Sequence, residues 1–101
     1  MSTKTQSLPA IQVSVVRAAS RPWSLCRVPQ VVDRVGKSTS SVYQDVADGL
    51  FPPPVKIGVR AAAWPDHEVD AIVRARVAGR SDSEIRELVR RLVTERADAD
   101  R

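Results

Sequence analysis

The fold is decided by residues 50–64, which read LFPPPVKIGVRAAAW. The three consecutive prolines at positions 52 to 54 exclude an α-helix here. Val55 and Ile57 alternate with Lys56, and Gly58 permits a tight turn before a second extended run that ends at Trp64. The pattern predicts a small two-stranded hairpin with Gly58 at its tip, and the position of Trp64 at the end of the hairpin predicts a core side chain.

Two short helices are predicted before this hairpin. The first carries four valines at spacings of three and four, which is typical of one helical face: Val28, Val31, Val32 and Val35. Gly36 can end this helix in the left-handed conformation. Ser38 can cap a second helix, Thr39–Ala47, by accepting a hydrogen bond from a free backbone N–H. Two helices joined by a short glycine-containing turn form a helix-turn-helix, and a hairpin beside it is a wing.

Two further helices are predicted after the hairpin. Pro65 suits the start of the first, and the acidic residues that follow complement the positive end of the helix: Asp66, Glu68 and Asp70. The second begins at a capping box between Ser81 and Glu84 and ends near Arg96. It carries an amphipathic stripe with a period near 3.6 residues: Ile85, Leu88, Val89, Leu92 and Val93.

These elements predict a mainly α protein with a small β-hairpin, built as a winged helix-turn-helix. Its organisation is expected to comprise four parts: a flexible, disordered N-terminal tail over 1–24, the winged helix-turn-helix domain over 25–79, the C-terminal amphipathic helix over 80–96 and a frayed tail over 97–101.

Charge divides the chain into two unlike parts. Residues 1–64 hold eight Lys/Arg against three Asp/Glu, whereas residues 65–101 hold eight against nine. The positive charge therefore lies with the predicted wing and helix-turn-helix, where a polyanion such as double-stranded DNA would bind.

Composition argues against several other classes of protein. One cysteine and one histidine form neither a disulfide nor a zinc site, which needs about four ligands. The chain carries no nucleophile motif or glycine-rich phosphate loop, so we expect neither an enzyme nor a bound cofactor or metal. It holds no apolar run near the roughly 20 residues of a membrane span. A cytoplasmic, nucleoid-associated protein is expected.

The stretch from Arg27 to about Ala71 resembles the AlpA-type phage transcriptional regulators and the related excisionases of the MerR-like winged-helix class. The resemblance rests on VPQV at 28–31, Gly36, STSSVY at 38–43, GLFPPPVKIG at 49–58, Arg60, AWP at 63–65 and Glu68-Val69. Three positions depart from the family pattern. The family usually has an apolar residue at Lys37, often arginine at Thr39, and an apolar or aromatic residue at Asp45.

The resemblance implies DNA contacts from the second helix and from the wing. The N-terminal part of that helix enters the major groove in helix-turn-helix proteins, where hydroxyl, amide and free N–H groups bind phosphates or base edges. A wing arginine can enter the minor groove. The predicted DNA-binding residues are Lys37, Ser38, Thr39, Ser40, Ser41, Tyr43, Gln44, Lys56 and Arg60.

Each of these residues also has a purely structural interpretation. Ser38 can act as a helix cap alone, and the ring of Tyr43 can simply pack against the core. An exposed Gln44 usually contacts nothing specific. Lys56 and Arg60 can be solvated charges that protect a strand edge from pairing with another chain.

Three functions stay open at this point. The first is sequence-specific binding of duplex DNA that regulates transcription of phage, prophage or mobile-element genes. The second is an excisionase that bends attachment-site DNA for an integrase, which would then be a partner. The third is a protein-interaction adaptor that acts through the C-terminal helix. A homodimer is also predicted through the stripe of that helix, because exposed apolar patches mark interfaces: Ile85, Leu88, Val89, Leu92 and Val93.

Overall fold

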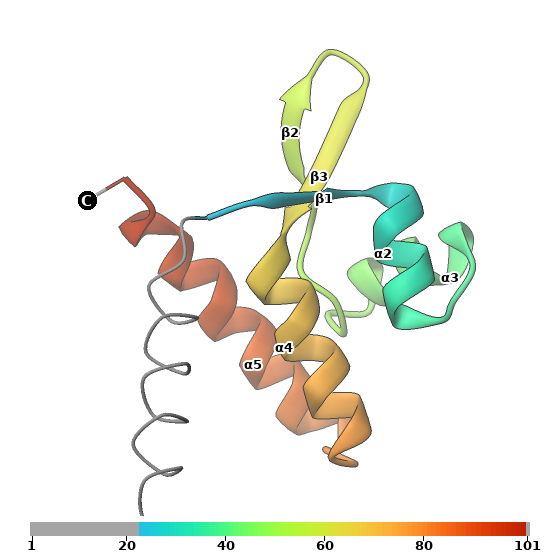
Figure 1. Ribbon diagram of the computed structural model, residues 1–101. Coiled ribbons are helices and arrows are strands. Elements are labelled where there is room, and N and C mark those ends of the chain that lie inside the picture. The colour runs from blue at the N-terminus through green and yellow to red at the C-terminus, as the bar shows by residue number, and fades with distance from the viewer. Residues whose placement is uncertain (1–22, 101) are drawn as a thin grey trace, which may run out of the picture.

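The computed structural model describes residues 23–100, so the predicted tail 1–24 lies outside the described residues except for its last two. Figure 1 shows a hairpin that stands away from a helical body. The elements in chain order are β1 (Leu25–Arg27), α2 (Val28–Val35), α3 (Thr39–Ala47), β2 (Val55–Gly58), β3 (Ala61–Pro65), α4 (Asp66–Val77), α5 (Asp82–Glu95) and a 3-10 turn, η1 (Arg96–Asp98).

The two helices of the helix-turn-helix begin and end where the sequence predicts. Pro29 lies in the first turn of α2, and Gly36 ends this helix with φ at 71°, a left-handed conformation that a side chain would strain. Ser38 caps α3 because its Oγ accepts a hydrogen bond from the backbone N–H of Ser41 at 3.2 Å. Local capping therefore sets the turn between α2 and α3.

The sheet has three antiparallel strands in the order β1-β3-β2, one more than the sequence predicts. The additional strand, β1, pairs Cys26 with Trp64 and Arg27 with Ala63. Three residues are too few to show an alternating pattern, and their partner strand lies far along the chain, so the sequence alone carries no signal for this strand.

The hairpin tip differs from the prediction by one residue. Gly58 is the last residue of β2 and pairs with Ala61, so the turn consists of Val59 and Arg60. A break in the register between Lys56 and Gly58 makes Ile57 the irregular residue of this strand. Gly58 has an ordinary φ, and a Cβ placed there would lie 3.4 Å from the Cβ of Ala61. Neither the backbone conformation nor the space at Gly58 therefore requires glycine, and Arg60 lies in the turn.

Helices α4 and α5 pack together and complete one core around Trp64. The buried residues of this core come from every helix and from the sheet: Cys26, Val31, Val42, Leu50, Phe51, Ala63, Trp64, Val69, Ile72, Ala75, Ile85, Val89 and Leu92. This arrangement is a winged helix-turn-helix with an additional C-terminal helix, as predicted.

The stripe of α5 packs against the protein's own core. Ile85, Val89 and Leu92 are buried, and Leu88 and Val93 are partly buried against the same cluster. Replacing Leu92 by glutamate would therefore bury a carboxylate without a partner and is expected to destabilise the fold.

Candidate nucleic-acid interface

The wing carries Lys56 on the side of the sheet that faces α3. Lys56 pairs with Ala62, and side chains of directly opposed residues lie on one face of a sheet. Trp64 follows Ala62 by two residues in β3 and thus lies on this face too. The Trp64 ring contacts the ring of Tyr43 in α3, with centroids 5.8 Å apart. Lys56 therefore lies on the face of the sheet whose inner end packs against α3 through Trp64.

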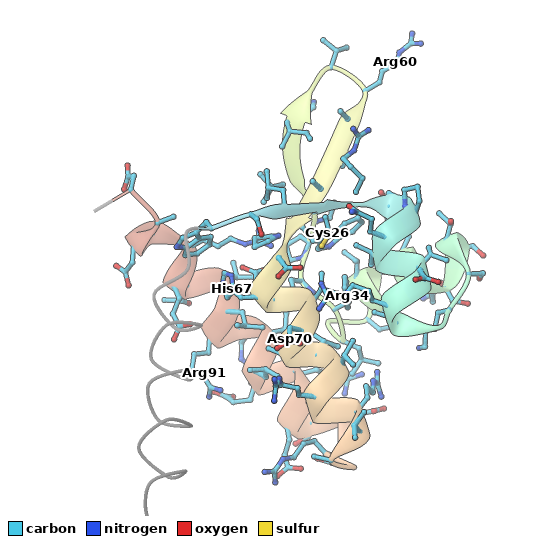
Figure 2. All side chains as sticks on the ribbon, in the orientation of Figure 1. Cys26, Arg34, Arg60, His67, Asp70 and Arg91 are labelled. Carbon is cyan, nitrogen blue, oxygen red and sulfur yellow. The ribbon has the colours of Figure 1, made fainter. Side chains whose placement is uncertain are left out.

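Arg60 lies at the outermost point of the wing. Figure 2 shows its side chain pointing away from the helical body. Its neighbour in the turn, Val59, is 90% exposed. Within the described residues Arg60 has neither an ion-pair partner nor a hydrogen-bond acceptor. An open hollow of about 360 Å³ runs along the wing beside it, lined by Pro54, Lys56, Val59, Arg60, Ala61 and Ala62. Two cations thus lie among the residues that line this shallow surface.

The N-terminus of α3 presents a cluster of hydroxyl groups. Besides capping the helix, Ser38 Oγ donates to Ser41 Oγ at 3.0 Å and lies 3.4 Å from Ser40 Oγ. These three residues and Thr39 are all exposed. The structure thus brings four of the predicted site residues together at one helix end, with Ser38 also serving as the cap.

Lys37 forms an ion pair with Asp45, the Nζ and Oδ2 atoms being 2.7 Å apart. These are two of the three positions at which the chain departs from the pattern of the family it resembles. The two departures compensate each other in charge, and the carboxylate holds the lysine against α3. Lys37 is therefore less available to a phosphate than Lys56 or Arg60.

Tyr43 and Gln44 each have a partner inside the chain. Tyr43 remains 40% exposed although its ring packs on Trp64. The side-chain amide of Gln44 donates to Asp48 Oδ1 at 3.2 Å. The hydroxyl end of Tyr43 can still reach a ligand while its ring packs, whereas Gln44 must exchange one hydrogen bond for another.

A polar cluster joins α2 to α4. Arg34 Nη1 donates to Asp66 Oδ1 at 2.5 Å, and its Nη2 lies 3.5 Å from Asp70 Oδ1. Cys26 Sγ donates to the same Asp66 oxygen at 3.2 Å. Burial raises the pKa of the Cys26 thiol, and this hydrogen bond raises it further. The cluster therefore holds a protonated, weakly nucleophilic thiol and fixes the position of α2, a structural role.

Sequence reasoning did not include Arg27 among the site residues. It is exposed, ends β1 and precedes the first turn of α2. Its register partner is Ala63 of β3, so it lies at the base of the wing, on the face of the sheet opposite to Lys56 and Trp64. The sequence carries no signal for this placement of Arg27, because it depends on the pairing of β1 with β3.

Other classes of site find little support in the part of the chain that the structure describes. Residues 23–100 bring no three His, Cys, Asp or Glu side chains together as metal ligands. None of their helices is both long and apolar enough to cross a bilayer.

Comparisons with known proteins match the central part of the chain. A family model described as "Prophage CP4-57 regulatory protein (AlpA)" matches residues 24–77, which run from just before β1 to the end of α4. The "Uncharacterized protein ORF88" of Enterobacteria phage P4 is 43% identical over 54 residues, 54% of this chain and 61% of that protein. The chain thus spans less than two thirds of this relative's length. No solved structure matches the chain.

The family match spans the whole winged helix-turn-helix and leaves out only the flanking segments, including α5. Because this match covers more than half of the sequence, the chain belongs to the AlpA family of prophage regulatory proteins.

Proposed function

We propose that this protein binds double-stranded DNA sequence-specifically and regulates transcription of phage, prophage or mobile-element genes. The observation that carries the proposal is the wing, whose exposed cations Lys56 and Arg60 project from the same domain that presents α3 with its exposed hydroxyl-rich N-terminus. In this geometry α3 enters the major groove and reads base edges through Thr39, Ser40 and Ser41. The wing contacts the neighbouring backbone or minor groove.

The adaptor alternative receives less support from the structure. It needs a free apolar face on α5, but three of the five stripe residues lie in the core. The homodimer predicted through the whole stripe stays a prediction, although only Leu88 and Val93 of that stripe are partly exposed. Sedimentation of the purified chain over a range of concentrations would test it.

The regulator and the excisionase differ in where the protein binds, because both use the same fold. Nuclease footprinting on the DNA that flanks the gene separates them. We expect protection at a promoter. Protection confined to an attachment site beside an integrase gene would instead support the excisionase and an integrase partner.

DNA affinity is expected to fall steeply as salt rises. Each neutralised phosphate contributes about 0.9 to the log–log slope, so contacts from Lys56 and Arg60 alone would contribute about 2. Titration of labelled duplex DNA at several salt concentrations measures this slope. A flat salt response would contradict the assignment of DNA as the ligand.

Replacing Arg60 by alanine is expected to weaken DNA binding about tenfold or more, because a charge-assisted hydrogen bond to phosphate is lost. The fold should remain intact, since the side chain lies at the wing tip away from the core (Figure 2). A phosphate contact would also reduce the salt slope by about 1 at all sequences. Binding titrations paired with thermal melts test this.

The matched control for that variant is Arg90→Ala. Arg90 is an exposed arginine of α5 that pairs with Glu87 in its own helix. It should leave DNA affinity unchanged. An Arg60→Ala protein that binds as tightly as the Arg90→Ala protein would show that the wing tip does not contact DNA.

A further inference from the structure

One guanidinium group links the two roots of the wing. Arg96, directly after α5, donates from Nε to Glu68 Oε2 at 2.8 Å and from Nη2 to Glu68 Oε1 at 2.6 Å. The same Nη2 donates to the backbone carbonyl of Pro53 at 2.8 Å. Pro53 lies two residues before β2 begins, and Glu68 lies three residues after β3 ends. The chain entering the wing and the chain leaving it are thus held by one side chain.

The contact is well enclosed. The Glu68 side chain is fully buried, and the Arg96 side chain is 21% exposed. The neighbouring carbonyl of Pro52 accepts a hydrogen bond from Trp64 Nε1 at 2.7 Å. The carbonyls of Pro52 and Pro53, in the segment that leads into β2, are therefore both held by side chains from elsewhere in the fold.

The wing needs such support because of its own architecture. β1 pairs with β3 only over residues 63–65, so the outer part of the wing is a two-stranded ribbon. Two-stranded ribbons are marginally stable by themselves. β2 is an edge strand held by β3 alone, which leaves its root at Pro53 as the point where its direction is set.

Arginine suits this position better than lysine. Its planar fork grips both carboxylate oxygens and still offers a donor to a third acceptor, whereas a lysine ammonium is a single point charge. Arg96 lies outside the segment 24–77 that matches the family model, so the C-terminal extension supplies this contact.

We propose that Arg96 is a positioning residue for the wing: by holding both roots it sets the angle of the wing to α3 and thereby the reach of Arg60 on DNA. This inference rests on the proposed DNA-binding function. In this proposal α5 places the guanidinium of Arg96, which follows it directly, at the base of the wing.

The direct test measures wing orientation without DNA. Residual dipolar couplings of the backbone amides are compared between wild type, Arg96→Lys and the matched control Arg90→Lys. Arg96→Lys keeps a cation beside Glu68, so the chain should stay folded, as a thermal melt will verify. We expect the couplings of residues 55–62 to change relative to those of α4 in Arg96→Lys only. Unchanged couplings in that variant would overturn the inference.

A double-mutant cycle with Arg60 tests the consequence for DNA binding. Arg60→Ala should lower DNA affinity about tenfold in the wild-type background and at most about threefold in the Arg96→Lys background. The second loss is smaller because a displaced Arg60 side chain already contributes less to DNA binding. In the Arg90→Lys background the loss should again be about tenfold.

The outcomes of these experiments separate the proposed DNA-binding function from the positioning of the wing by Arg96. Equal losses in all three backgrounds would show that Arg96 only stabilises the fold and would overturn its role in DNA binding. If wild type does not bind duplex DNA while the couplings of the wing still change, the proposed function fails and the positioning of the wing by Arg96 stands.

Discussion

Replacing Trp64 by alanine is expected to lower the free energy of unfolding by about 3–5 kcal/mol and, with it, the midpoint of thermal unfolding. The whole side chain is buried, and its ring lies between Tyr43 and Phe51 with both centroids 5.8 Å away. A domain of this size has about 5–15 kcal/mol of stability in total. Urea and thermal denaturation followed by circular dichroism measure the loss.

A second substitution at the same position separates packing from hydrogen bonding. Trp64→Phe keeps an aromatic ring but removes the donor to Pro52, whose buried carbonyl then lacks its partner at a cost of about 1–3 kcal/mol. We therefore expect Trp64→Phe to melt between wild type and Trp64→Ala. If Trp64→Ala melted within a few degrees of wild type, the placement of this residue at the centre of the core would be wrong.

Replacing Arg96 by alanine is expected to cost about 3–5 kcal/mol, because the Glu68 carboxylate would stay buried without its cation. Removing both charges together should lower the free energy of unfolding far less than removing Arg96 alone. A double variant, Glu68→Met with Arg96→Met, should recover most of the lost stability, since a buried ion pair can be replaced by apolar groups of similar size. Denaturant titrations of the single and double variants measure the difference.

Arg91→Ala is the matched control for Arg96→Ala. Arg91 is an exposed arginine five positions earlier, on α5 (Figure 2). Surface substitutions of this kind usually change stability by about 0.5 kcal/mol or less. Equal effects of Arg91→Ala and Arg96→Ala would mean that the ion pair with Glu68 adds nothing beyond a surface charge.

Features decided within a few neighbouring residues were predictable from the sequence. Gly36 and the Ser38 cap set the turn of the helix-turn-helix, and the capping box between Ser81 and Glu84 starts α5 as predicted. The prolines at 52 to 54 kept this segment out of a helix. In each case the deciding interaction, a φ angle or a hydrogen bond across one turn, lies inside the stretch that encodes it.

The candidate site was predictable in part for the same reason. Arg60 was expected near the hairpin tip because strand, turn and strand follow each other directly. The turn itself was misplaced by one residue, because the irregularity at Ile57 moves Gly58 into the strand. The ion pair between Lys37 and Asp45 could not be predicted from the single positions, because the two residues are eight positions apart and Lys37 lies in the turn before α3.

Only the tertiary structure decided what the amphipathic and charged faces contact. The sequence predicted a C-terminal helix with an apolar stripe, but the fold determined that this stripe fills the core. The sequence also predicted Glu68 as a charge near a helix N-terminus; the fold buried it and supplied Arg96, 28 residues away, as its partner. Periodicity shows that a face is apolar and a charge shows its sign. The residues that contact such a face or charge come from distant parts of the chain. Their identity depends on how the helices and strands pack together in one core.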